Sequence, residues 1–218
     1  MVKKTKVVVV NPANPSKEAL EPAAFAAREG QAVVFPTDTV YGVGTTALKP
    51  EAVLDIFRIK ERPVSKPLIL LIADLEDLSY YVSDVSPSAS KLIKEYWPGP
   101  LTIIFKKSEN VPYEVTAGGD TVGIRCPDNL IARMLIRLAG IALATTSANL
   151  AGQPSPKNAD EARKNLGGRV SYIIDGGQVK LGIESTVLDL SSDKPKLIRE
   201  GYIPWSELKK RLGSLQGH

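Results

Sequence analysis

Short runs of β-branched and apolar residues alternate with longer stretches of helical periodicity along this 218-residue chain. Such alternation is typical of an α/β domain, in which helices cover a central sheet. The pattern predicts nine strands, at residues 6–10, 32–35, 67–73, 101–106, 121–125, 141–145, 170–174, 184–190 and 195–200. We therefore expect one sizeable sheet.

Start and stop residues mark six helices between these strands. No stretch carries a long heptad repeat, so packing on the sheet is expected to set the helix lengths. The predicted starts are Pro22, Pro50, Ser86-Pro87, Asp128, Asn158 and Pro204, and the predicted closing glycines are Gly30, Gly140 and Gly167-Gly168.

The length of the chain is that of one globular domain with a substantial core. We expect residues 1–212 to form this domain, residues 213–218 to be a flexible tail, and no second domain to be present. The 28 Lys and Arg residues against 24 Asp and Glu give a net charge of +4 and a pI near 9.0. This balance suits a site for phosphates or carboxylates, and it suits weak RNA binding equally well.

Cysteine and histidine are almost absent from the chain. Cys126 is the single cysteine, which excludes an internal disulfide and a zinc thiolate cluster and favours a reducing cytoplasm. The single histidine is His218, the last residue, so a histidine triad or a histidine metal site is not expected. No apolar stretch is long enough to span a bilayer, and no signal-peptide pattern is present, so a soluble protein without a membrane partner is expected.

Lys60 and Arg62 are the first candidates for chemistry. They follow the helix predicted from Pro50, and Pro63 disfavours helical geometry at Arg62, so both cations can turn toward one ligand. Two converging cations suit a polyphosphate. The pair also fits a basic helix end that complements the helix dipole, and the segment alone leaves both interpretations open.

Two polar loops follow apolar strands. The first, TTSAN at residues 145–149, offers hydroxyl, amide and backbone N–H groups for a nucleotide, although ordinary turns use the same residue types. The second, PTDTVYG at residues 36–42, offers hydroxyls and a ring for a small polar amino acid. In that loop, Asp38 could instead cap a turn, and Tyr41 could lie in the core with its hydroxyl paired.

Arg125 ends the predicted strand TVGIR. It is a candidate fork for a carboxylate or phosphate, or a plain surface cation. The neighbouring Cys126 has no internal histidine to act as its base, so we interpret it as a small buried side chain. The residues Asp175-Gly176-Gly177 are interpreted as a tight turn rather than a metal site.

Taken in order, these segments resemble the YrdC-like family over residues 33–201. PTDTVYGVG is similar to the family's threonine-side loop, Lys60-x-Arg62-Pro63 to its basic motif, and Ser147-x-Asn149 to its nucleotide-side motif. WPGPLT, TVGIRCP, GQPSP, ESTV and Arg199-x-Gly201 follow in the family's order. Two departures are Ala151, where many relatives carry serine, and the end of the chain soon after Leu212, without the linker and C-terminal domain of longer relatives.

The resemblance implies a twisted, open, mixed α/β sheet flanked by helices, with a concave basic face. It also implies synthesis of L-threonylcarbamoyl-AMP from L-threonine, bicarbonate and ATP, with release of pyrophosphate, for modification of a tRNA adenosine next to the anticodon. Mg²⁺ is expected to arrive with ATP, because no dense carboxylate cluster suggests a protein cage. The other partners implied are weakly bound tRNA and a downstream tRNA threonylcarbamoyl transferase.

The site residues that the resemblance implies fall into three groups. Lys60 and Arg62 are expected to stabilise charge during catalysis. The implied ATP-binding residues are Lys60, Arg62, Ser147, Asn149, Ser155 and Arg199. The implied threonine-binding residues are Thr37, Tyr41, Thr121, Arg125 and Ser185.

Two other functions stay open as alternatives. A non-enzymatic, double-stranded RNA-binding module would also use a basic concave surface, although the chain lacks an RRM-type aromatic pattern and a KH glycine loop. A carbamoyl-transfer module, like the related domain of hydrogenase maturation, normally lies in a longer chain with acylphosphatase-like and zinc-finger segments.

Overall fold

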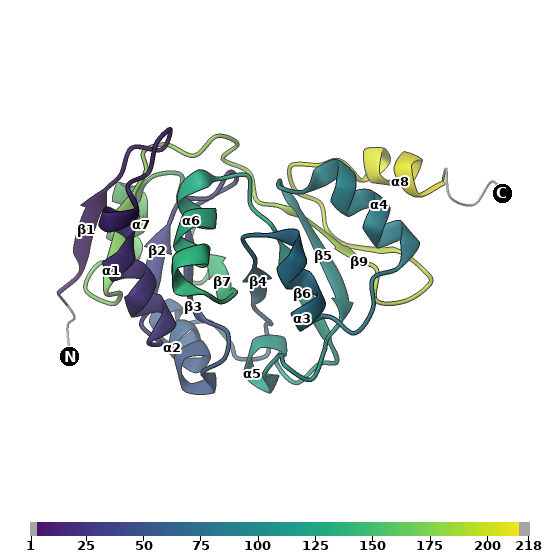
Figure 1. Ribbon diagram of the computed structural model, residues 1–218, viewed down its shortest axis with the longest axis horizontal. Coiled ribbons are helices and arrows are strands. Elements are labelled where there is room, and N and C mark those ends of the chain that lie inside the picture. The colour runs from purple at the N-terminus through teal and green to yellow at the C-terminus, as the bar shows by residue number, and fades with distance from the viewer. Residues whose placement is uncertain (1–3, 214–218) are drawn as a thin grey trace.

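The computed structural model describes residues 4–213, which form a ten-stranded sheet flanked by helices (Figure 1). The strands are β1 Lys6–Val9, β2 Val33–Phe35, β3 Gly42–Thr46, β4 Ile69–Leu71, β5 Leu101–Lys106, β6 Thr121–Arg125, β7 Leu143–Ser147, β8 Tyr172–Asp175, β9 Thr186–Asp189 and β10 Lys196–Arg199. The helices are α1 Lys17–Arg28, α2 Pro50–Lys60, α3 Leu78–Tyr81, α4 Pro87–Tyr96, α5 Tyr113–Thr116, α6 Leu130–Ala139, α7 Ala159–Leu166 and α8 Trp205–Gly213.

The strand order is β1-β8-β2-β3-β7-β4-β6-β5-β9-β10. Parallel pairs such as β4–β6 and β5–β9 occur beside antiparallel pairs such as β3–β7 and β5–β6. This mixed, open α/β sheet confirms the predicted fold class. Segments that are distant in the sequence become neighbours, because β7 lies between β3 and β4 and β9 lies beside β5.

Alternate side chains of the sheet point to two separate cores. Leu70 and Ile124 are register partners in the larger core, which α2, α4 and α7 cover. Leu71 points to the opposite face, where α1 and α6 pack on Phe35 and Leu143. Other side chains of this second face, on β4, β5, β6 and β9, line a cavity. The cavity therefore lies where the helices leave part of one face of the sheet uncovered.

Strand β3 corrects the sequence interpretation, which takes PTDTVYGVG at residues 36–44 as a loop and predicts no strand over residues 42–46. Glycine is depleted in strands, so the pattern there does not indicate one. In the structure, a Cβ on Gly44 would lie 2.6 Å from Thr145 Oγ1 of β7, and a Cβ on Gly42 would lie 3.0 Å from Thr145 Cγ2. The glycines thus let β3 approach the Thr145 side chain closely.

Helix α1 begins at Lys17 rather than at the predicted Pro22. The Ser16 hydroxyl caps it by accepting a 3.2 Å hydrogen bond from the Ala19 N–H. Pro22 therefore lies inside the helix. Helix α6 is capped in the same way by Asn129, one residue later than predicted.

The predicted tail has only its first residue, Gly213, within the described part of the chain, as the last residue of α8. His218 and the rest of the tail lie outside the described residues. Between residues 4 and 213, the helices are too short or too polar to cross a bilayer.

Candidate active site

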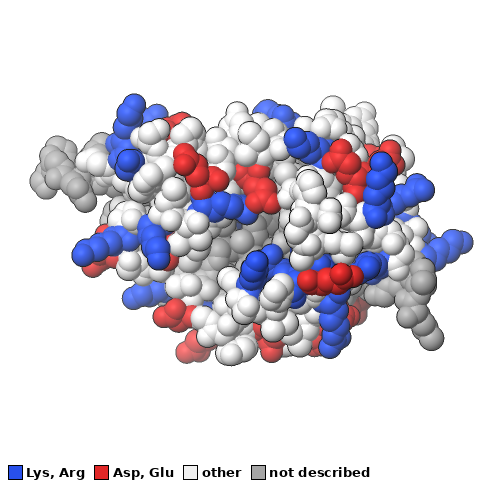
Figure 2. Space-filling model, turned by 180° about the vertical axis from the view of Figure 1, so that it is seen from behind, with Lys and Arg blue, Asp and Glu red and all other residues white. Residues whose placement is uncertain are grey.

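The cavity on the uncovered face has a volume of about 730 Å³, a size typical of ligand sites. Its hollow lies near the middle of Figure 2, with Lys and Arg side chains along its edges. Among the described residues, the cations on its wall are Arg62, Lys66, Arg125 and Arg199, and the one carboxylate on its wall is Glu184. The excess of cations suits an anionic ligand.

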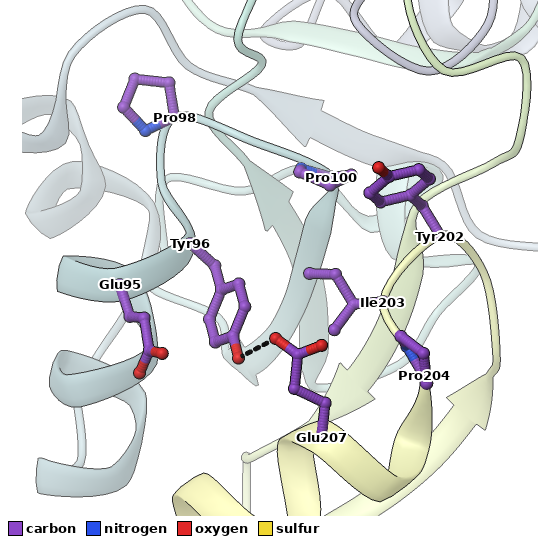
Figure 3. A pocket seen from close by; sticks show the side chains of 8 residues that line it. All are labelled: Glu95, Tyr96, Pro98, Pro100, Tyr202, Ile203, Pro204 and Glu207. Atoms are coloured by element: carbon purple, nitrogen blue, oxygen red, sulfur yellow. Dashed lines mark hydrogen bonds between the residues drawn. The ribbon is translucent and has the colours of Figure 1, made fainter.

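A smaller pocket of about 420 Å³ lies between α4 and α8 (Figure 3). Tyr96 donates a 2.7 Å hydrogen bond to Glu207 across it. Its lining carries the carboxylates Glu95 and Glu207 and, within the described part of the chain, no Lys or Arg. This pocket does not suit an anionic substrate, so we place the candidate site in the larger cavity.

Arg125 and Asp38 form an ion pair at the buried end of the cavity, with side chains 4% and 1% exposed. Arg125 Nη2 donates to Asp38 Oδ1, Nη1 donates to Thr39 Oγ1 at 2.8 Å, and Nε donates to Gly99 O at 2.9 Å. Burial lowers the pKa of Arg125, and the Asp38 charge opposes this shift. Three acceptors thus hold the guanidinium in one orientation.

Asp38 Oδ2 is also buried, and it has no hydrogen-bond partner among the described residues. An unpaired buried acceptor costs about 1–3 kcal/mol. The buried pair is therefore poorly explained as a device for stability. Its clearer consequence is that Arg125 keeps a fixed place on the wall.

Thr37 organises the loop between β2 and β3. Its hydroxyl donates to Val40 O at 2.7 Å and accepts from the N–H groups of Thr39 and Val40. Thr37 and Thr39 both line the cavity, and so does Thr121 at the start of β6. The structure therefore brings four of the five predicted threonine-side residues to one cavity: Thr37, Thr121, Arg125 and Ser185.

The part of the wall that carries Arg62 and Arg199, which we call the exposed end, is less buried. Arg62 donates to Lys66 O at 3.3 Å and to Pro67 O at 3.1 Å, which fixes it to its own loop. Arg199 pairs with Glu184, and these side chains are 45% and 33% exposed. Burial lowers the pKa of Arg62, the Glu184 charge raises it, and the Arg199 charge lowers it again. Arg62 and Arg199 thus act on one region of the wall, beside Ser147 and Ser185.

Lys60 lies behind this wall and is 2% exposed. Its Nζ donates to Ser147 O, to Asn149 O at 2.6 Å and to Asn149 Oδ1 at 3.4 Å. Burial lowers the pKa of Lys60 to about 8, and the Arg62 charge adds to this effect. These three hydrogen bonds tie Lys60 to the last residue of β7 and to the turn that follows it. In this geometry Lys60 positions Ser147, while the predicted contact with ATP stays a prediction.

Three other predicted residues do not line the cavity. Tyr41 is fully buried, and its hydroxyl donates to Gly177 O at 2.7 Å. This is the core alternative considered above, and burial raises the pKa of the Tyr41 hydroxyl. Asn149 donates to Gln153 O at 2.6 Å and so closes its own turn. Ser155 donates to Glu184 at 2.6 Å and lies behind that carboxylate.

The predicted site residues leave out six polar residues of the wall: Thr39, Ser65, Lys66, Thr145, Thr146 and Glu184. Thr39 and Lys66 belong to segments that the motifs already mark, so their polar side chains are a usable signal. Glu184 is the first residue of the ESTV segment, from which only Ser185 is assigned to the site. Within residues 4–213, no group of three or more His, Cys, Asp or Glu residues is arranged to hold a metal ion.

Comparisons with known proteins identify the family and the fold. A sequence model of the Sua5/YciO/YrdC family, described as telomere recombination, matches residues 26–201. Over 191 residues the chain is 44% identical to the threonylcarbamoyl-AMP synthase of Pyrococcus abyssi, which covers 88% of this chain. The crystal structure of P. abyssi Sua5 complexed with L-threonine superposes with a TM-score of 0.93 over 96% of this chain, at 42% identity.

The crystal structure of Escherichia coli YciO matches over 95% of this chain and 99% of that one, with 30% identity and a TM-score of 0.85. The match covers a smaller share of the P. abyssi protein than of this chain. The chain spans 56% of the length of that synthase and 61% of the chain in its crystal structure.

Proposed function

Because the chain belongs to the Sua5/YciO/YrdC family, we propose that it makes L-threonylcarbamoyl-AMP from L-threonine, bicarbonate and ATP, with release of pyrophosphate. The name of the P. abyssi relative and the threonine in its crystal structure support this activity. The product would supply the threonylcarbamoyl group for a tRNA adenosine next to the anticodon. A downstream tRNA threonylcarbamoyl transferase and weak tRNA binding are proposed as partners, and the cytoplasm is proposed as the location.

One observation carries the proposal. A single cavity holds a buried arginine beside hydroxyl groups and, elsewhere on its wall, partly exposed arginines. The buried end suits a small amino acid, because Arg125 offers a fixed fork to a carboxylate and the hydroxyl groups of Thr37 and Thr39 lie beside it. The exposed end suits a triphosphate, because Arg62, Lys66 and Arg199 lie there.

The proposed reaction needs positioning and charge stabilisation rather than a covalent enzyme intermediate. The threonine nitrogen bonds to the carbon of bicarbonate, water leaves, and a carbamate forms. A carbamate oxygen then bonds to the α-phosphorus of ATP while the bond between that phosphorus and the bridging oxygen breaks, and pyrophosphate leaves. Arg62 and Arg199 would stabilise the charge on the phosphates, and the Ser147 hydroxyl would contact phosphate or ribose.

Mg²⁺ enters this scheme as part of the substrate MgATP, where it neutralises phosphate charge. Among the described residues, the cavity wall carries a single carboxylate, Glu184. That donor set fits a magnesium ion held mainly by phosphates and water, which is its usual state in nucleotide sites.

Pyrophosphate release in the presence of ATP, magnesium and bicarbonate tests the function, with threonine, serine and valine supplied in turn. A missing methyl is worth about 1–3 kcal/mol, so serine should be used roughly ten- to two-hundred-fold less efficiently than threonine. Valine should be rejected more strongly, because it leaves buried polar groups unpaired. Release that does not depend on bicarbonate, or equal use of valine and threonine, would overturn the proposed function.

A further inference from the structure

Glu184 is a carboxylate on the wall of a cavity that otherwise carries cations. Its Oε2 accepts a hydrogen bond from Arg199 Nη1, and its Oε1 accepts one from the Ser155 hydroxyl at 2.6 Å. Its charge also raises the pKa values of Lys60 and Arg62. A negative charge in this place repels phosphates. We therefore ask what a carboxylate contributes to a cavity that is proposed to bind them.

Arg199 has other anchors than Glu184. Its Nε and Nη2 atoms donate to Ser185 O at 3.2 Å and 2.9 Å, whereas Glu184 engages Nη1. The two charged side chains are also partly exposed, so water can replace either partner at small cost. The pair can therefore open while Arg199 stays on the wall.

Of the two arginines that are paired with carboxylates at the cavity, only Arg199 can change its partner. Arg125 is buried with Asp38, and water does not reach that pair. Arg199 can exchange Glu184 for another anion, such as a phosphate oxygen, within the same cavity. Glu184 thus stands in competition with any anion that approaches Arg199.

We propose that Glu184 competes with bound polyphosphate for Arg199 and so promotes the release of pyrophosphate. This inference rests on the proposed function, because its ligands are the triphosphate of ATP and the pyrophosphate that leaves. Phosphate oxygens take Nη1 of Arg199 from Glu184 when ATP binds. Glu184 takes it back as pyrophosphate departs. Without this carboxylate, the same cations hold pyrophosphate more tightly, and product release, a frequent rate limit in enzymes, becomes slower.

The test is the equilibrium dissociation constant for inorganic pyrophosphate, measured by calorimetry with EDTA present and again with magnesium. Glu184→Gln removes the charge but keeps an oxygen for Ser155, and Glu184→Asp keeps the charge. Glu207→Gln is the matched control, because it removes a carboxylate that is also hydrogen-bonded but lies in the pocket between α4 and α8 (Figure 3). Thermal unfolding verifies that each variant is folded.

Glu184→Gln should bind pyrophosphate about tenfold more tightly than the unmodified chain in both buffers. Glu184→Asp and Glu207→Gln should stay within about threefold, since both leave the charge of the cavity unchanged. Unchanged or weaker binding by folded Glu184→Gln would overturn the inference and leave the proposed function standing. If Glu184→Gln binds pyrophosphate more weakly only in the magnesium buffer, Glu184 is a ligand of the metal. That result also overturns the inference. An unmodified chain that binds no pyrophosphate would remove the inference and the proposed function together.

Discussion

The two arginine–carboxylate pairs of the cavity differ in exposure. The side chains of Arg125 and Asp38 are 4% and 1% exposed, whereas those of Arg199 and Glu184 are 45% and 33% exposed. A buried pair cannot open without leaving a bare charge in the protein, whereas water can replace either partner of an exposed pair. One cavity can therefore combine a fixed contact for a small substrate with an exchangeable contact for a polyphosphate.

The largest expected effect is a loss of stability when a substitution removes one partner of the buried pair. Asp38→Ala leaves Arg125 buried without its counter-charge, which should lower the free energy of unfolding by about 3–5 kcal/mol. Glu184→Ala should lower it by less than about 1 kcal/mol, because Arg199 remains in contact with water. Urea unfolding of the two variants measures both values. Equal losses in the free energy of unfolding would show that the exposure of a pair does not determine its contribution to stability.

The next effect is on turnover, at the exposed end. Arg62→Ala should lower the rate of pyrophosphate release by about a hundredfold, because a fixed positive charge beside the phosphates is lost. Arg28→Ala, at the end of α1, removes the same charge elsewhere and should leave the rate unchanged. Near-normal turnover in a folded Arg62→Ala protein would contradict the assignment of this end to the triphosphate.

Lys60 is buried although it lies behind the exposed end of the cavity. Burial lowers its pKa from 10.5 to about 8 in the folded protein. Between these values the unfolded chain holds a proton that the folded chain has released, so this group makes the free energy of unfolding rise with pH. Below about pH 8 both states hold the proton, and the cost of the buried charge is fully present.

The Lys60→Met variant isolates this contribution. The free energy of unfolding of the unmodified chain, minus that of the variant, should increase between pH 8 and pH 10. Urea unfolding at several pH values gives the difference directly. Two parallel curves over this range would mean that Lys60 titrates normally and is not confined as the structure describes.

The smallest expected effect concerns Cys126, which is next to Arg125 and 1% exposed. Burial raises the pKa of its thiol to about 11, despite the nearby arginines, so the reactive thiolate is scarce at neutral pH. This confirms the interpretation of a small buried side chain. Cys126→Ser should keep turnover within about threefold. Abolished turnover in a folded variant would restore a nucleophilic role.

Local patterns predicted the fold well where periodicity is strong. The apolar runs of β5 and β6, the first residue of α2 and the caps of α4 and α7 are all visible in the sequence. Strand β3 was missed because its glycines serve a close contact with Thr145 of a distant segment. Strand propensity is a local property, so it cannot predict a contact that depends on tertiary packing.

The site was predicted less evenly than the fold. Arg62, Arg125 and Arg199 all reach the cavity, whereas Tyr41 points into the core, where Gly177 accepts its hydrogen bond. Glu184 begins the ESTV segment, but its place on the wall depends on long-range contacts with Ser155 and with Arg199 of β10. Sequence reasoning identifies chemical types in loops, and long-range contacts decide which of them share a surface.

The most direct measurement compares two matched variants, Arg125→Lys and Arg199→Lys, in calorimetric titrations with threonine and with pyrophosphate. Each variant keeps the positive charge and loses the planar fork of arginine. We predict that Arg125→Lys weakens threonine binding by about tenfold or more and leaves pyrophosphate within about threefold, and that Arg199→Lys does the reverse. If either variant weakens both ligands equally, the cavity is not divided into a threonine end and a polyphosphate end.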